Sequence, residues 1–390
     1  MKLKPSKTLI TIMVLLTFFY LFPCCQAEAY SVSYQILNEP NGSTYYRLNV
    51  TIQQSLYDYY RGKSHALNSE ADFAKFVTPY ALKPIADKLW EIYSDDEDFA
   101  NGVLMIVHQI PYEVTEPAKY PIETMVENKG DCDLFSFIAA SIMKAGGLEV
   151  VLLYYEKEAH MNVGVSLSHT PYDARRQVYY ITYNNIKYYI AECTGYFQDG
   201  WRVGECPDSL KQASAEIITL ENCERSSPGQ VSASYKPLNA STISLTVSPT
   251  YVINQGTVSL TGEISPALPN KTVTIYISVN NSPWKVLGIT TTDSNGQFRY
   301  VWNVETSSGV CFVRASWSGD YNYAGADSPI QTVTVLSAFF VLLLATTTIL
   351  VCMGVIIFIT SRQAQPKIQE PQPPEIPSQT EKTFTNQLKH

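Results

Sequence analysis

Cys132 stands at a point in the sequence where a thiol can act as a nucleophile. It directly follows Gly130 and Asp131, and it opens a stretch in which apolar residues recur every three or four positions up to Gly146 and Gly147. That period predicts a helix that begins near the cysteine and ends at the glycines. The free N–H groups and the dipole at a helix start stabilise an anion, and the N–H of Cys132 can donate to an oxyanion. We therefore predict a nucleophilic thiolate at this position.

His160 and Glu192 are the groups that could serve this thiolate. From His160 to Leu167, apolar side chains alternate with small or polar ones, so a strand would place His160 on the small, polar face. Glu192 lies in the apolar segment 187–193, where a carboxylate usually has a partner. Taken singly, residues of these types more often have a structural role. Together they predict a triad in which Cys132 is the nucleophile, His160 is the base and Glu192 orients the histidine.

The elements that must position this triad follow a mixed pattern of helices and strands. Alternation from Tyr30 to Thr51 around a turn at 38–42 predicts a hairpin. Apolar residues at helical spacing then predict helices, and segments rich in Val, Ile and Tyr predict strands. A helix packed on an antiparallel sheet follows from this order. The predicted helices are 71–77, 81–93, 99–108 and the stretch from Gly130 to Gly146, and the predicted strands are 149–155, 160–167, 178–183 and 187–193.

The residue composition and pattern change after residue 240. The segment 224–240 contains Ser226-Ser227-Pro228-Gly229 and is typical of a linker. Between 241 and 335, short segments rich in Thr, Val and Ser alternate with turns. Short strands at this spacing predict a β-sandwich.

Three ordered motifs lie between about Phe73 and Pro207. They are Pro121-x-Glu-Thr with Gly130-Asp-Cys-Asp, then His160-Met-x-Val-Gly-Val, and last Glu192-x-Thr with Gly200-Trp-x-x-Gly204-x-x-Pro207. These motifs resemble the prokaryotic transglutaminase-like family of cysteine proteases and acyltransferases. The resemblance implies a papain-like fold, attack of Cys132 on a carbonyl, proton transfer through His160 and a hydrogen bond that holds the imidazole to Glu192.

The later segment resembles bacterial immunoglobulin-like repeats of surface proteins, through Thr291–Phe298 and Ala315–Tyr323. In that resemblance Cys311 alternates with Val313 on a core face, so its thiol is expected to be buried and inert. The expected fold class is therefore α+β. It has a transglutaminase-like (papain-like) domain with an N-terminal extension over 30–223, an immunoglobulin-like β-sandwich over 241–335 and one transmembrane helix.

The sequence departs from the family pattern at the predicted oxyanion hole. Relatives often place Gln before an Ile-Pro-Tyr motif, whereas this sequence has His108 and Gln109 before Ile110-Pro111-Tyr112. The resemblance therefore leaves His108 and Gln109 as candidates for the second oxyanion donor.

Two apolar segments predict passage to the cell exterior. Residues 1–29 have the basic start, apolar stretch and small residues of a secretory signal peptide, although a retained N-terminal anchor has a similar pattern. The charge-free run 336–360 precedes Arg362, which predicts a transmembrane helix and a disordered cytoplasmic tail over 361–390. This topology is that of a single-pass cell-membrane protein with its N-terminal domains outside. In that compartment the glycosylation candidates are Asn41, Asn49, Asn239 and Asn270, and the disulfide candidates are Cys206 and Cys223.

Composition and spacing narrow the partners. The sequence has 28 Lys and Arg and 36 Asp and Glu, which gives a formal net charge of -8. It contains no basic run that would indicate a nucleic-acid partner. No His or Cys pair has zinc-like spacing, so we expect no metal and no cofactor. We predict a cysteine peptidase or acyltransferase acting on peptide or isopeptide bonds of cell-envelope or extracellular proteins, with water or an amine as acceptor. The alternative is a catalytically inactive cell-surface binding or adhesion module on an immunoglobulin-like stalk.

Overall fold

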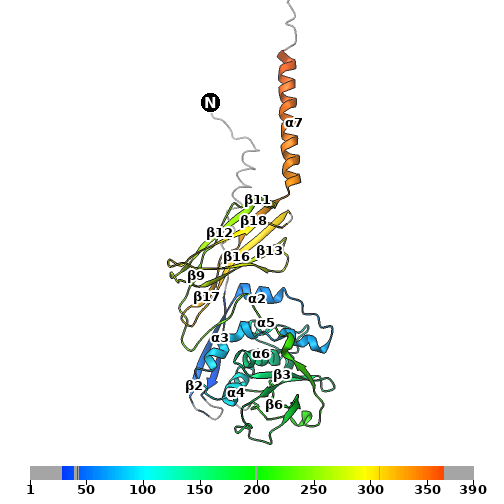
Figure 1. Ribbon diagram of the computed structural model, residues 1–390, viewed down its shortest axis with the longest axis vertical. Helices are drawn as coiled ribbons and strands as arrows, with labels where there is room; N and C mark the ends of the chain where they lie inside the picture. Colours follow the sequence, from blue (N-terminus) through cyan, green and yellow to red (C-terminus); the bar gives the residue numbers. More distant parts are fainter. Residues whose placement is uncertain (1–28, 39–41, 43, 198–199, 307, 364–390) are drawn as a thin grey trace, which may run out of the picture. The chain divides into compact units, whose positions relative to one another are not determined.

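The computed structural model describes residues 29–38, 42, 44–197, 200–306 and 308–363 (Figure 1). The chain divides into two units, Met1–Ser337 and Ala338–His390, and the described part of the second unit is helix α7 (Ala338–Gln363). The predicted signal peptide, apart from Ala29, lies outside the described residues. So do Asn41 and most of the predicted tail.

The first unit opens with the predicted hairpin. β1 (Ala29–Leu37) and β2 (Tyr45–Gln53) pair antiparallel over their full length, as the alternating side chains indicate. β8 (Ser232–Ser234) pairs with the other edge of β2 and completes a three-stranded sheet. Part of the predicted linker 224–240 is therefore a strand of this sheet.

Helical segments lead from this hairpin to the triad. α4 starts where the Asp95 side chain accepts the N–H groups of Glu97 and Asp98, which satisfies two of the free donors of a helix start. Helices α2 and α5 were not predicted, because each spans only about two turns and gives a weak periodic signal. The bounds are α2 (Gln54–Arg61), the 3-10 helix η1 (Glu70–Phe76), α3 (Pro79–Leu89), α4 (Asp96–Val107) and α5 (Pro121–Glu127).

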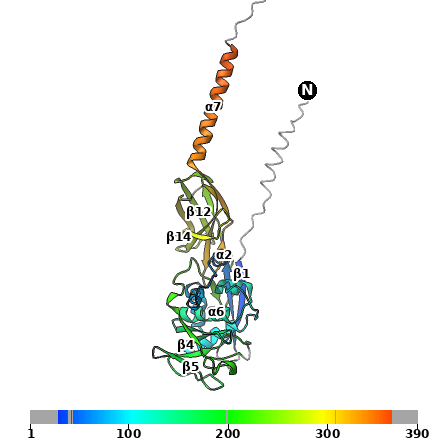
Figure 2. The ribbon, with the colours of Figure 1, turned by 90° about the vertical axis from the view of Figure 1, so that its right-hand side faces the viewer.

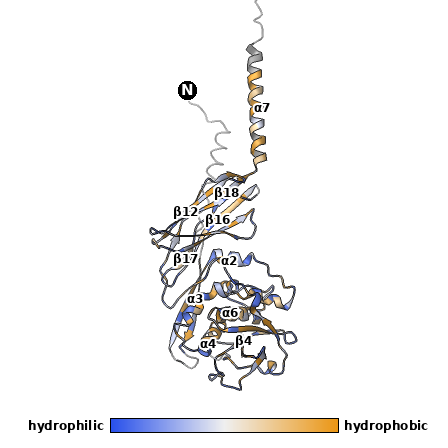
Figure 3. Cartoon of the chain, viewed as in Figure 1, coloured by the Kyte–Doolittle hydropathy of each residue, from blue (hydrophilic) through white to orange (hydrophobic). Residues whose placement is uncertain are grey.

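Helix α6 (Cys132–Ala145) is the central element of the triad region and packs against β3 and β4. Leu134, Phe137 and Ile138 on this helix are fully buried, and Figure 3 shows apolar residues gathered on α6 and beside it. Gly147 ends the helix with a φ of 92°, a conformation that glycine adopts without strain. The antiparallel sheet beside α6 has the order β5 (Tyr180–Tyr183), β6 (Ile186–Ala191), β4 (His160–Ser166), β3 (Glu149–Tyr155) and β7 (Glu216–Thr219). Two short 3-10 turns, η2 (Asp208–Leu210) and η3 (Leu220–Asn222), flank β7.

The segment after residue 240 forms two sheets around one apolar core (Figure 2). Leu260, Trp302 and Val313 come from three different strands of this core and are buried. One sheet contains β9 (Thr242–Ile243), β10 (Thr246–Ser248), β12 (Thr257–Ser265) and β15 (Gln297–Asn303). The other contains β11 (Tyr251–Ile253), β13 (Thr272–Val279), β14 (Lys285–Thr291), β16 (Gly309–Gly319), β17 (Ala324–Asp327) and β18 (Gln331–Leu336).

The predicted fold class, α+β with a transglutaminase-like (papain-like) domain and a transmembrane helix, is wrong. Strands hold 35% of the described residues and helices 26%, so the described part of the protein is mostly β-sheet and has no clear papain-like core. Periodicity identified single elements. It did not show how much of the chain the many short strands after residue 240 make up together, relative to the helices before it. Among the residues that the structure describes, no helix is both long and apolar enough to cross a membrane.

The glycosylation candidates differ in their surroundings. Asn239 and Asn270 are exposed, and Asn270 occupies a turn with a φ of 55°. Asn49 lies within β2, and its side-chain amide donates to the Ser234 carbonyl at 3.4 Å. The first two positions are therefore the accessible ones.

Candidate active site

The structure brings the three predicted triad residues together at the ends of three elements. Cys132 is the first residue of α6, His160 is the first residue of β4, and Glu192 directly follows β6. β4 and β6 pair antiparallel with Val163 opposite Ala191, so one further step of this register places Glu192 beside the start of β4. The Nε2 atom of His160 lies 2.9 Å from Oε2 and 3.1 Å from Oε1 of Glu192.

Glu192 is fully buried and is held by several donors. Its Oε1 accepts the Thr194 N–H at 2.9 Å and the Thr194 hydroxyl at 2.6 Å, and its Oε2 accepts the Asn162 amide at 3.2 Å. Burial alone raises the pKa of a carboxyl group, but the hydrogen bonds and the charge of His160 outweigh it and hold the pKa of Glu192 below its usual value. Glu192 is therefore a fixed anion that orients the imidazole.

The His160 ring links this anion to the thiol. Because Nε2 faces Glu192, Nδ1 is the ring nitrogen left for Cys132. Burial opposes the positive charge of His160, but hydrogen bonds to Cys132 and Glu192, together with the charges of both, raise its pKa to about 10. The unfolded imidazole has an ordinary value of 6.5. The stability gained from this interaction is thus complete below about pH 6.5 and is lost as the pH rises through about 10.

The cysteine itself is partly exposed and lies at the helix start. Its Sγ lies 3.9 Å from the carbonyl oxygen of Ala159, the residue before the histidine. The Ser136 hydroxyl, one turn into α6, is 2.7 Å from the Cys132 carbonyl and 3.1 Å from the Met161 carbonyl. These contacts fix the start of α6 against the start of β4. The arrangement can support attack of a thiolate on a carbonyl, with the imidazole as proton carrier.

Neither predicted oxyanion candidate lies beside the cysteine. Gln109 accepts the Gln35 N–H and donates to the Gln35 and Met105 carbonyls, so its amide is fully occupied near β1. His108 is buried behind the triad, where its Nε2 lies 3.0 Å from the Glu192 carbonyl oxygen. Burial lowers the pKa of His108 despite this contact, which favours the neutral ring. The structure therefore assigns His108 a supporting place and Gln109 none at the thiol.

Three supporting residues were not assigned a role from the sequence. Asn162 shares the strand face of His160, and Thr194 lies two positions after Glu192, so both carried a positional signal. Asp131 belongs to the Gly130-Asp-Cys-Asp motif, but its partner is distant in sequence: its Oδ2 accepts the Thr115 N–H at 2.7 Å. This bond ties the segment around residue 115 to the residue that precedes the nucleophile.

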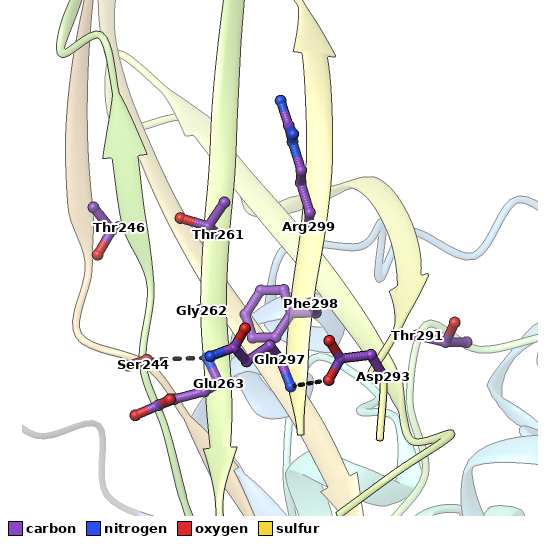
Figure 4. Close-up of a pocket in the computed structure, with 10 residues that line it drawn as sticks. All are labelled: Ser244, Thr246, Thr261, Gly262, Glu263, Thr291, Asp293, Gln297, Phe298 and Arg299. Carbon is purple, nitrogen blue, oxygen red and sulfur yellow. Dashed lines mark hydrogen bonds between the residues drawn. The ribbon is translucent and has the colours of Figure 1, made fainter. Parts of the chain in front are cut away.

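A cleft of about 910 Å³ opens at Cys132 and His160. Its size is within the range of sites that bind small molecules. A second cavity, of about 560 Å³, lies on the β-sandwich (Figure 4). There the Glu263 N–H donates to the Ser244 hydroxyl and the Gln297 N–H to Asp293, and the lining has no thiol or imidazole. Only the first of these two cavities contains groups for covalent catalysis.

One cluster has the composition of a metal site. Ligand atoms of Asp95, Asp96 and His169 lie within 4.8 Å of one another. His169 instead forms an ion pair with Asp95 at 2.9 Å, and this contact, together with the Thr170 carbonyl, raises the pKa of His169 to about 8. A protonated imidazole cannot bind a metal ion, so the ion pair competes with metal binding at neutral pH.

The predicted disulfide between Cys206 and Cys223 is not formed in the structure. Cys206 packs among Tyr155 and Ile190, whereas Cys223 belongs to the larger cluster that contains α6. The prediction was based on the oxidising exterior and on the number of cysteines, neither of which specifies the distance between the two thiols. Cys311 is fully buried in the sandwich core, and burial raises the pKa of its thiol, as expected of an inert group.

Comparisons with known proteins find no matching family model and no matching curated protein. The chain is similar to a CARDB domain from Pyrococcus furiosus, solved with di-metal ions, over 24% of this chain and 91% of that one, at 12% identity and a TM-score of 0.19. It is similar to the human F-spondin reeler domain over 27% of this chain and 95% of that domain, at 9% identity and a TM-score of 0.20. A chitin-binding domain from Burkholderia pseudomallei matches over 23% and 56%, at 14% identity and a TM-score of 0.18. Scores this low carry no argument about function.

Proposed function

We propose that this protein is a cysteine hydrolase or acyltransferase that acts on amide bonds of peptides. The observation that carries the proposal is the contact of His160 Nε2 with the fully buried Glu192 carboxylate, while the same ring interacts with a thiol at a helix start. A solely structural cysteine has no need of an oriented imidazole. The motif order that resembles the transglutaminase-like family agrees with these roles.

The proposed reaction proceeds in two steps. The Cys132 thiolate attacks the amide carbonyl carbon, and the N–H of Cys132 donates to the oxyanion that forms. The His160 imidazolium gives its proton to the leaving amine as the C–N bond breaks, which leaves a thioester on Cys132 and a neutral ring. Water or a second amine then attacks the thioester, His160 takes up the proton, and the thiolate is released.

The second candidate is a catalytically inactive peptide-binding module. The observation in its favour is that neither His108 nor Gln109 reaches the thiol as a second oxyanion donor. Loss of one such donor costs about 10²- to 10³-fold in rate where it has been measured in other enzymes, so a single donor is compatible with slow turnover.

A peptide library separates the two candidates. The full-length protein is incubated with amide-bonded peptides and a primary amine, and the products are identified by mass. We expect the untreated protein to convert peptides into products with a new carboxylate or a new amide. After iodoacetamide has alkylated Cys132, the protein should form neither product. Peptide binding that is retained after alkylation, with no product before it, would establish the binding module instead.

A further inference from the structure

Apolar side chains form much of the walls of the cleft at Cys132. Leu67, Phe73 and Tyr154 are among them, and the rings of Phe73 and Tyr154 lie 5.4 Å apart. Tyr112 and Val114, from the segment between α4 and α5, line the cleft as well. The nucleophile therefore lies in a cavity whose sides are mostly aromatic or aliphatic.

These side chains remain open to solvent although they are apolar. Leu67 is 40% exposed, Tyr112 is 59% exposed and Val114 is 73% exposed. Apolar groups that gather around a cavity without being covered commonly mark a surface where a ligand binds. A substrate side chain placed here would remove both its own apolar surface and that of the walls from water.

The charged groups that line the cleft disfavour a negatively charged ligand. The carboxyl groups of Asp131, Asp133 and Glu116 line it, and no Lys or Arg is among its lining residues. Burial and the neighbouring Asp131 raise the pKa of Asp133 to about 8, so this carboxyl group contributes little repulsion at neutral pH. The Asp131 Oδ1 atom is buried without a hydrogen-bond partner. Of the two imidazoles on the lining, His160 is engaged with Glu192 and His65 with Glu123 at 2.8 Å. A negatively charged substrate side chain would find repulsion and no free cationic partner.

We propose that the acyl donor carries a bulky apolar side chain next to its reacting carbonyl, and that Leu67 and Val114 select it while the carboxyl groups of the cleft reject acidic donors. This inference rests on the proposed function, because it names the substrate class of the same site. It also stands as a statement about binding, which is measurable without turnover.

The test uses acetylated peptide amides that differ only in one side chain: Leu, Phe, Gly or Asp. We expect kcat/KM for the Leu and Phe peptides to exceed that for Gly by about 10-fold or more, and the Asp peptide to be the poorest. Leu67→Ser and Val114→Ser should each lower kcat/KM for the Leu peptide much more than for the Gly peptide, and so remove most of the preference for Leu over Gly. Val301→Ser, a half-exposed valine on β15 of the sandwich, is the matched control and should change nothing.

Binding of fluorescently labelled forms of the same four peptides to the Cys132→Ala protein separates this inference from the proposed function. If Leu and Phe peptides bind preferentially but none is turned over, the proposed function fails and the apolar subsite stands. Equal binding and equal turnover of all four peptides, or a preference for Asp, would overturn the subsite.

Discussion

Cys132→Ala is expected to lower turnover of any amide donor by at least about 10³-fold. The methyl group of alanine cannot attack a carbonyl, so no thioester can form and only peptide binding remains. The residue is partly exposed at the first position of α6, and alanine is a good helix former, so the variant should fold. Release of product, followed by mass, measures the effect.

Cys206→Ala is the matched control for this variant. Cys206 is also a free thiol, but it is buried in a separate apolar cluster, and burial raises its pKa to about 11. Turnover by this variant should stay within about twofold of the unaltered protein. If Cys132→Ala kept full activity and Cys206→Ala lost it, Cys206 rather than Cys132 would be the nucleophile, and the proposed assignment would be wrong.

Glu192→Gln is expected to lower kcat by about 10- to 1,000-fold while the substrate KM changes little. Glutamine can still hydrogen-bond the ring, but it cannot stabilise the imidazolium by charge, so the proton carrier is weakened in the transition state. The carboxylate is fully buried and does not line the cleft, so direct contact with substrate is not lost. Steady-state kinetics over a range of pH provide the measurement.

The control for a general effect of removing a buried carboxylate is Glu205→Gln. Glu205 is also fully buried and is paired with Arg175 at 2.8 Å. Removing its charge should lower thermal stability and leave kcat of the folded protein within about twofold. Equal losses of kcat in both variants would mean that Glu192 has only a structural role.

The elements that carry Cys132 and His160 could be predicted from sequence because their neighbours set strict local patterns. The helical period after Cys132 and the alternation after His160 fixed both elements to within a few residues. Antiparallel pairing of β4 and β6 then brings Glu192 beside the histidine, although β5 lies between these two strands in the sequence. Local periodicity therefore placed each residue on its element, whereas the pairing of the two strands depends on the sheet.

What could not be predicted depends on contacts between distant segments. The bond between Thr115 and Asp131 and the cleft walls at residues 67 and 114 join loops without a period of their own. The place of His108 behind Glu192 was missed because family position suggested a donor, whereas burial directs its ring to a backbone carbonyl. The fold class failed for a similar reason, since single elements do not specify how sheets assemble.

The titration of His160, followed by NMR of labelled histidine, tests the central claim that Cys132, His160 and Glu192 act as a coupled unit. The chain has five histidines, and His160→Gln assigns the signal. The imidazolium should persist to a midpoint near pH 10, and the midpoint should fall in Cys132→Ala because that variant removes a hydrogen bond and a charge that raise the pKa. His169, with an expected midpoint near pH 8, serves as the internal reference and should not move. A His160 midpoint near 6.5 that is unchanged in Cys132→Ala would contradict the coupled pair and, with it, the proposed catalysis.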